Sequence, residues 1–289
     1  MRLHIECLPC YVRQAIQVSK MTTDDERLQW ETVHAVADYL TRIDSSNDSM
    51  MVAETVHQMI KDTLGNPDPY FDVKEEYTEI AERMESLIGE LASQGDDPLL
   101  TAIKIAIAGN IIDFGAGSGF DVEKAIRGSL DFALAVNHYE AFRETLDKAG
   151  TILYLCDNTG EIYFDKPLLK LLAGRDVTIC VRGGPILNDA TREYAERAGL
   201  HEFGTLIDTG ILSPGFPIDR VQAGARDLFY GSDMVISKGQ ANFETLNNVV
   251  RPGFFLLMKV KCDLVARILG TRYGDIVLME SGRIPMNDD

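Results

Sequence analysis

The segment Thr151-Ile152-Leu153-Tyr154-Leu155-Cys156 is followed directly by Asp157-Asn158-Thr159-Gly160-Glu161. A short β-branched and aliphatic run that stops at an acid, an amide and a glycine predicts a buried strand with oxygen ligands at its carboxyl end. Open α/β sheets bind their ligands at this end of the strands. The segment therefore predicts an α/β fold with a functional site at the rim of the sheet.

Three later segments repeat the pattern of a buried strand followed by polar residues. The predicted strands 176–181, 233–237 and 254–258 lead in turn to Asn188-Asp189-Ala190-Thr191, Lys238-Gly239-Gln240-Ala241-Asn242-Phe243-Glu244 and Lys259-Val260-Lys261-Cys262-Asp263. Parallel strands joined by right-handed crossovers place their carboxyl ends on one edge of the sheet. We therefore expect the four polar clusters to share one crevice.

The hydrophobic pattern changes near residue 150, where we place a domain boundary. Residues 1–149 have helical periodicity and no strand-like alternation. The helices expected there span 23–40, 51–64, 72–91, 98–112, 122–135 and 139–149. After residue 150, short apolar runs alternate with helical segments, which indicates βαβ units. Strands near 203–208 and 275–279 would complete a mostly parallel sheet of about six strands.

Two local signals predict helix ends in the first half of the chain. Thr23 and Glu26 have the spacing of a capping box, so a helix is expected to begin at this point. Gly65, which precedes Asn66-Pro67-Asp68-Pro69, is expected to end the helix over 51–64.

Composition limits the classes of function. The chain has 289 residues and a formal net charge of -17, which argues against binding to the phosphate backbone of a nucleic acid. It has no apolar run of membrane-spanning length and no signal peptide, so we expect a cytoplasmic protein with reduced cysteines. A small phosphorylated metabolite could still bind if a cation and a lysine reverse the local field. No sequence feature specifies an oligomeric state.

Asp157, Asn158 and Asp189 carry oxygen donors of the kind that magnesium, manganese or calcium prefers over zinc or copper. Two carboxylates and one amide would leave coordination positions for water and a substrate phosphate. The alternative is purely structural: Asp157 and Asn158 would form a turn, and Asp189 would cap the following helix.

Lys238 follows a predicted strand and precedes Gly239, so its ammonium group is expected at the sheet rim, where it would neutralise phosphate charge. The alternative is a surface lysine at the end of a strand. Asn242 and Glu244 would either orient substrate or cap the helix that begins there.

The segment Asp113-Phe114-Gly115-Ala116-Gly117-Ser118-Gly119 imitates the nucleotide loop of Rossmann-type methyltransferases. That loop requires a preceding strand and an acid at the end of a second strand. Both flanking segments have helical periodicity, so a loop between helices is the better interpretation.

Cys7, Cys10 and Cys262 could supply three thiolates to a metal. We favour structural packing for these cysteines, followed by metal ligation and then redox chemistry.

An ordered set of motifs resembles the DUF89 family of metal-dependent damage-control phosphatases over most of the chain. The set comprises Cys7-x-x-Cys10, Gly109-Asn110-x-x-Asp113, Asp157-Asn158-x-Gly160-Glu161, Asn188-Asp189-x-Thr191, Lys238-Gly239-x-x-Asn242-x-Glu244 and Lys261-Cys262. The cysteines and the Lys-Cys pair resemble its prokaryotic, cysteine-bearing branch. The resemblance implies an N-terminal all-helical domain (1–149) packed on a three-layer α/β/α Rossmann-like domain (150–289).

The resemblance also implies a function and a set of site residues. Asp157, Asn158 and Asp189 match residues that bind a divalent cation such as Mg, Mn, Co or Ni, and Lys238 matches a phosphate-contacting lysine. Asn110 and Asp113 match a motif that brings the helical domain to the pocket. The implied activity is hydrolysis of phosphate from sugar phosphates and from damaged or surplus phosphometabolites.

On this reading the chain is a phosphomonoesterase, because a metal ion and an ammonium group together stabilise the negative charge that accumulates during hydrolysis. Glu161 would orient the substrate or a water on the metal, and Gly160 and Gly239 would let the substrate approach the backbone. The nucleophile is either that water or the Asp157 carboxylate. The alternatives are a methyltransferase that uses S-adenosylmethionine and a non-catalytic protein that binds a metal or ligand.

Overall fold

The computed structural model describes residues 1–110 and 122–283, which form an α/β protein around a seven-stranded sheet. The strand order is β1-β7-β6-β5-β2-β3-β4. The strands are β1 Leu134–Asn137, β2 Thr151–Leu155, β3 Asp176–Val181, β4 Thr205–Asp208, β5 Met234–Lys238, β6 Phe254–Lys259 and β7 Ile276–Glu280. The five adjacent strands β6, β5, β2, β3 and β4 run parallel to one another. Strand β7 is antiparallel to β6 and parallel to β1. The predicted α/β class with a mostly parallel sheet is therefore confirmed.

Strand β1 corrects two predictions, namely a sheet of about six strands and a helix over 122–135. Helix α6 ends at Leu130, and Leu134–Asn137 pairs with β7 at the edge of the sheet. With only four residues, β1 is too short for its alternation to stand out beside the apolar pattern of α6. All six predicted strands are present, with ends that differ by at most two residues.

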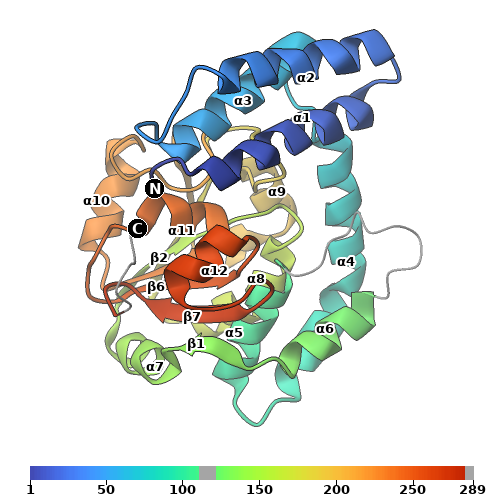
Figure 1. Ribbon diagram of the computed structural model, residues 1–289. Helices are drawn as coiled ribbons and strands as arrows, with labels where there is room; N and C mark the ends of the chain where they lie inside the picture. The colour runs from blue at the N-terminus through green and yellow to red at the C-terminus, as the bar shows by residue number, and fades with distance from the viewer. Residues whose placement is uncertain (111–121, 284–289) are drawn as a thin grey trace.

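Twelve α-helices surround the sheet within the described ranges. They are α1 Leu8–Thr22, α2 Glu26–Leu40, α3 Ser49–Leu64, α4 Phe71–Ser93, α5 Pro98–Ala108, α6 Val122–Leu130, α7 Tyr139–Lys148, α8 Ile162–Leu171, α9 Arg192–Arg197, α10 Ala223–Gly231, α11 Gln240–Leu246 and α12 Asp263–Leu269. In Figure 1, α1, α2 and α3 form a layer of their own above the sheet, and α4 runs down along one side.

Alternating residues of each strand pack into two separate cores, as the period of two in a strand requires. On one face Ile152 and Tyr154 of β2 pack with α4, α5, α7, α8 and α9. On the other face Leu153 and Leu155 pack with α10, α11 and α12. The result is three layers, α/β/α. Helices α4, α5 and α7 precede residue 150 but share the first core, and the domain boundary at that residue stays a prediction.

Helices α1, α2 and α3 have a third core, which includes Ala15, Val36 and Val56. Helix α3 ends as predicted at Gly65, which adopts a left-handed conformation with φ 62°. The start of α2 differs from the prediction. Asp25, not Thr23, is the N-cap, because its carboxylate accepts hydrogen bonds from the first free amides, those of Arg27 and Leu28.

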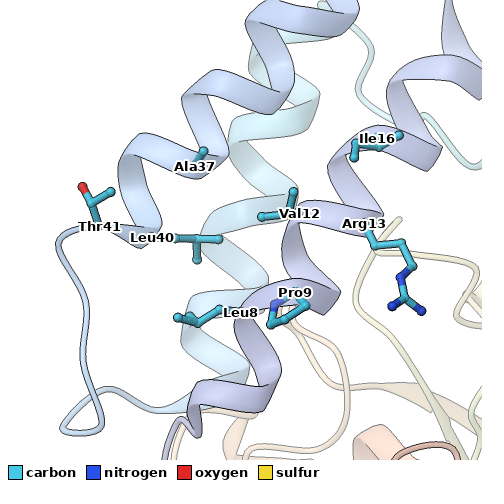
Figure 2. A pocket seen from close by; sticks show the side chains of 8 residues that line it. All are labelled: Leu8, Pro9, Val12, Arg13, Ile16, Ala37, Leu40 and Thr41. Carbon is cyan, nitrogen blue, oxygen red and sulfur yellow. The ribbon is translucent and has the colours of Figure 1, made fainter.

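A shallow apolar groove of about 630 Å³ lies between α1 and α2. Figure 2 shows Leu8 and Val12 of α1 beside Leu40 of α2 along its floor. The groove has no carboxylate in its lining, and it contains none of the predicted site residues. In the part of the chain that the structure describes, no helix is long and apolar enough to cross a membrane.

Candidate functional site

The loops after β2 and β3 are bonded directly to each other at the sheet rim. The Thr159 amide donates to the carbonyl of Asn188 at 2.9 Å, and the Ala190 amide donates to the carbonyl of Asp157 at 2.8 Å. Asn158 and Asp189 form an isolated antiparallel bridge between the same loops. This pairing brings together the two loops that carry the three predicted metal ligands.

Two amide side chains join Asp157 to Glu161. Asn110 Nδ2 donates to Asp157 Oδ2 at 2.7 Å and to Glu161 Oε2 at 2.5 Å. Asn158 Nδ2 donates to the same two oxygens at 3.0 and 3.1 Å. Asp157 and Glu161 therefore aim one oxygen each at a common point, where two amide groups hold them.

Asn110 reaches this point because α5 ends against the start of α8. A Cβ on Gly109 would lie 2.9 Å from Phe164 Cβ and 3.0 Å from Glu161 Cγ, so the close contact between the two helices requires a glycine there. The predicted partner of Asn110 in this motif, Asp113, lies outside the described residues, as do Gly115 to Gly119.

Asp189 pairs with Arg182, the first residue after β3. The Arg182 Nε donates to Asp189 Oδ2 at 2.6 Å, and Arg182 Nη2 lies 3.7 Å from Asp157 Oδ1. Helix α9 has Thr191 at its N-cap and no side-chain cap, so Asp189 does not serve as the helix cap of the structural alternative. Arg182 is 1 % exposed, and its charge therefore acts through little solvent.

Lys238, the last residue of β5, is fully buried behind Glu161. Its ammonium group donates to Glu161 Oε1 at 2.8 Å, to Asp165 Oδ1 at 2.5 Å and to the carbonyl of Ala106 at 2.8 Å. It is therefore not the surface lysine of the structural alternative. Because an ammonium group has three protons, all the donors of Lys238 are used within the protein.

Gly239 and Gly160 are required by close contacts beside the site. Gly239 has φ 80°, and a Cβ there would lie 1.8 Å from Asp157 Oδ2. A Cβ on Gly160 would lie 3.0 Å from the carbonyl oxygen of Tyr77 in α4. The first glycine thus makes room for the Asp157 carboxylate, and the second lets α4 approach the loop after β2.

Asn242 and Glu244 have different positions from the other predicted residues. Asn242 Nδ2 donates to the carbonyls of Cys156 and Lys238, at 3.1 and 2.7 Å, and so ties the end of β2 to the end of β5. The Glu244 carboxylate accepts from Gln240, and its carbonyl accepts from the N-terminal amine. The described hydrogen bonds of Glu244 are therefore with Gln240 and the N-terminus and not with Asp157 or its partners.

The three thiols that the sequence analysis considered, those of Cys7, Cys10 and Cys262, lie on the same side of the molecule as Glu244. Cys7 is the N-cap of α1, and Cys262 is the N-cap of α12, where its sulfur accepts from the amide of Val265 at 3.5 Å. Burial raises the pKa of Cys7 to about 11, with smaller contributions from Glu244, Cys262 and Cys10. None of the five cysteines forms a disulfide bond in the described structure.

Burial and mutual repulsion dominate the electrostatics of the carboxylates. Burial, followed by the charges of Glu161 and Asp189, raises the pKa of Asp157 to about 7. Burial also raises the pKa of Asp189, although Arg182 opposes it. The positive charge around these two carboxyl groups is therefore too small to offset the cost of ionising both of them.

The donor set fits a divalent cation. Four buried carboxyl groups (Asp157, Glu161, Asp165 and Asp189) share two buried cations (Arg182 and Lys238), so ionisation of all four leaves two uncompensated negative charges. The oxygens that converge are hard ligands, which Mg²⁺ and Mn²⁺ prefer. In the described ranges no three His, Cys, Asp or Glu side chains form a ready-made ligand group, and the predicted set has two carboxylates and one amide.

Lys261 is a third cation at the rim, after Arg182 and Lys238, and the site predictions did not include it. It follows β6 and is exposed, and its charge lowers the pKa of both Asp157 and Asp189. Its ammonium group has no acceptor among the described residues. The predicted convergence of the four polar clusters was a signal that could have identified Lys261.

Arg182 and Asp165 were also missed, and each had a weaker signal. Arg182 directly follows a buried strand at the rim. Asp165 stands four residues after Glu161, which places both on one face of α8.

Known proteins resemble this chain over most of its length. Residues 3–277 match the damage-control phosphatase ARMT1-like domain family. A damage-control phosphatase of Pyrococcus horikoshii is 33% identical over 286 residues, covering 97% of this chain and 99% of that protein. A damage-control phosphatase of Archaeoglobus fulgidus is 32% identical, covering 96% and 98%. The crystal structure of a DUF89 family protein from P. horikoshii superposes with a TM-score of 0.90 at 32% identity, covering 97% of this chain and 99% of that one.

Proposed function

Because the chain belongs to the damage-control phosphatase ARMT1-like family, also called DUF89, we propose that it is a metal-dependent phosphatase acting on phosphate monoesters of small metabolites. Its relatives support the phosphatase role. Sugar phosphates and damaged phosphometabolites are the proposed substrates. One observation carries the proposal: four buried carboxyl groups at the sheet rim, Asp157, Glu161, Asp165 and Asp189, carry two more negative charges than Arg182 and Lys238 balance.

Each residue has a distinct task in this proposal. Asp157, Asn158 and Asp189 would hold the divalent cation, with the amide of Asn158 turned to present its oxygen. When bound, the cation would stabilise the negative charge that accumulates on the phosphoryl oxygens. Lys261 would bind the phosphate from the solvent side, since its ammonium group is exposed and its field reaches Asp157 and Asp189. Lys238 would act on the phosphate through its charge.

We assign to Glu161 the task of orienting the attacking water. Its Oε1 is held by Lys238 and its Oε2 by Asn110 and Asn158, so the carboxylate has a single orientation. Both oxygens of Asp157 face other protein groups, so its carboxylate is poorly placed for attack on a phosphoryl group. We therefore assign the attack to water.

The test is release of inorganic phosphate from p-nitrophenyl phosphate and from a panel of sugar phosphates, with EDTA or with Mg²⁺, Mn²⁺, Co²⁺ or Ni²⁺. The proposal requires turnover that depends on the cation. Turnover on none of these esters would refute it.

Asp157→Asn separates catalysis from folding. It should reduce turnover by roughly a hundredfold or more, yet leave the metal-free protein at least as stable, because the substitution removes a repelled buried charge. Exposed Glu140→Gln, on α7, is the matched control and should behave like the wild type. A loss of stability in Asp157→Asn equal to its loss of activity would support a purely structural role.

A further inference from the structure

Three charged groups form a buried chain that leads away from the oxygens joined by Asn110, those of Asp157 and Glu161. Asp165 and Lys238 are fully buried, and Glu161 is 1 % exposed. Asp165 lies one helical turn after Glu161, so both side chains lie on the same side of α8. Lys238 lies between them, 2.5 Å from Asp165 Oδ1 and 2.8 Å from Glu161 Oε1.

Lys238 has no proton left for a ligand. Its third hydrogen bond goes to the carbonyl of Ala106 in α5, at 2.8 Å. A phosphate could accept a hydrogen bond from Lys238 only if it displaced one of these three acceptors. The position of Lys238 therefore affects the site chiefly through Glu161.

Asp165 has no described hydrogen bond to the oxygens that converge at Asn110. Its hydrogen-bonded contact with the site passes through Lys238, and its other polar neighbour is Tyr154 of β2. The fold does not need this carboxylate for charge balance, because Lys238 and Glu161 alone would form a neutral pair. A buried carboxylate is costly, and removal of Asp165 would leave no unpaired cation because Lys238 would keep Glu161 as its partner.

The charge of Asp165 has a definite effect on the cluster. With Asp165 present, one ammonium group is shared by two carboxylates, and the three groups together carry one negative charge. Without it, the ammonium group would cancel the charge of Glu161. Asp165 therefore keeps the neighbourhood of Asp157 and Asp189 negative, which favours a cation there.

We propose that Asp165 is a positioning residue that acts through Lys238: it fixes the orientation of Glu161 and supplies the negative charge that a divalent cation at Asp157 and Asp189 requires. This inference rests on the proposed function. In this inference, the buried chain Asp165–Lys238–Glu161 determines how tightly the site binds the cation.

The experiment measures Mn²⁺ binding to the metal-free protein by titration calorimetry, without substrate. Asp165→Asn should weaken Mn²⁺ binding on the order of tenfold or more, because it removes a buried negative charge near the cation. Asp165→Leu is a second variant in case the first does not fold, and it should have the same effect. Exposed Glu140→Gln makes the same carboxylate-to-amide change and should leave Mn²⁺ affinity unaltered.

Inhibition by inorganic phosphate provides the readout that structural damage would not reproduce. At saturating Mn²⁺, a less negative site should bind phosphate as tightly as the wild type or more tightly. A joint loss of Mn²⁺ affinity, phosphate affinity and thermal stability would overturn the inference, since it indicates disruption of the fold.

Two further outcomes separate this inference from the proposed function. Variants at Asp165 that bind Mn²⁺ like an active wild type would overturn the inference alone. A wild-type protein that neither binds Mn²⁺ nor hydrolyses any phosphate ester would overturn the proposed function, and the inference with it.

Discussion

Asn110 occupies the position in which a cation would relieve the repulsion between Asp157 and Glu161, because its amide donates to both carboxylates. It comes from the end of α5, far from either partner in the sequence. The Asn110 side chain thus links the helical part of the chain to the oxygen cluster. It also stabilises the cluster when no metal is bound.

Asn110→Asp tests this role, because it replaces a shared donor by a third carboxyl group of nearly the same shape. The metal-free variant should lose about 2 kcal/mol of unfolding free energy. Added Mg²⁺ or Mn²⁺ should then raise its unfolding midpoint more than that of the wild type, because the cation binds the folded state of a more negative site. A metal-free midpoint equal to the wild-type value would contradict this role, as would a cation effect no larger than in the wild type.

His57 gives the chain a dependence of stability on acid pH. It is buried in α3, and its Nε2 atom has no hydrogen-bond partner in the described structure. Burial, followed by the nearby charge of Lys61, lowers its pKa from 6.5 to about 4. The unfolded chain therefore takes up a proton between pH 6.5 and pH 4 that the folded chain does not bind, so acidification through this window favours unfolding.

His57→Leu removes this titration, and the expected difference can be measured by urea unfolding at pH 7 and pH 4.5. Between these values the wild type should lose about 2 to 3 kcal/mol more unfolding free energy than the variant. The carboxylates of the site titrate in both proteins, so their contribution largely cancels in the comparison. Equal losses in the two proteins would show that His57 is charged in the folded state.

At the scale of elements, the turn between β5 and α11 determines where the Asp157 carboxylate can lie. Gly239 combines a φ of 80° with a Cβ position 1.8 Å from Asp157 Oδ2. Gly65, at the end of α3, has a φ of 62° and no atom within 4 Å of its Cβ position. The two glycines share a positive φ, but they differ in ψ (166° at Gly239 and 25° at Gly65) and in what a side chain would meet.

Gly239→Ala and Gly65→Ala therefore form a matched pair. Gly65→Ala should cost about 1 to 2 kcal/mol of unfolding free energy for the left-handed conformation. Gly239→Ala should cost about 1 to 3 kcal/mol, because a positive φ with an extended ψ is a conformation that almost only glycine adopts. Gly239→Ala should in addition displace Asp157 and reduce phosphatase activity by roughly a hundredfold, whereas Gly65→Ala should keep wild-type activity. Phosphate release and thermal unfolding of both variants check this. Comparable activity of the two variants would mean that Asp157 does not need its observed position.

Elements with a strong local signal were predictable from sequence, and those defined by distant partners were not. The strand 176–181 matches β3 residue for residue, because its apolar run is bounded by the charged residues Asp176 and Arg182. Strand β1 was missed because its four residues are ordered by pairing with β7, about 140 residues away in the sequence.

The same distinction holds for the candidate site. Asp157, Asn158, Glu161, Asp189 and Lys238 follow strands at one edge of a parallel sheet, so their proximity followed from topology. The three acceptors of Lys238 could not be predicted, because they depend on how α5 and α8 pack against β5. Arg182 and Asp165 were missed for the same reason, since burial of an ion pair depends on side-chain packing from several elements.

At the scale of the whole molecule, α1, α2 and α3 are joined to the rest of the chain partly by polar contacts. Lys61 Nζ donates to the carbonyl of Pro185 at 2.5 Å, and Arg220 pairs with Glu54 at 2.8 Å. Their apolar core is distinct from the two cores that enclose the sheet. Exposed ion pairs add little stability, so we expect the three helices to open before the sheet does.

Hydrogen exchange followed by mass spectrometry tests this order. Amides of α1, α2 and α3 should exchange through openings of lower free energy than amides of β2, β3 and β5, and should lose protection at lower urea concentration. Glu54→Gln should speed exchange in the three helices by about twofold, because an exposed pair contributes about 0.5 kcal/mol, and it should leave the strands unchanged. The helices and strands could instead exchange with one common free energy of opening in both proteins. The molecule would then open as a single unit, because the polar contacts between its layers would stabilise it as much as the apolar cores do.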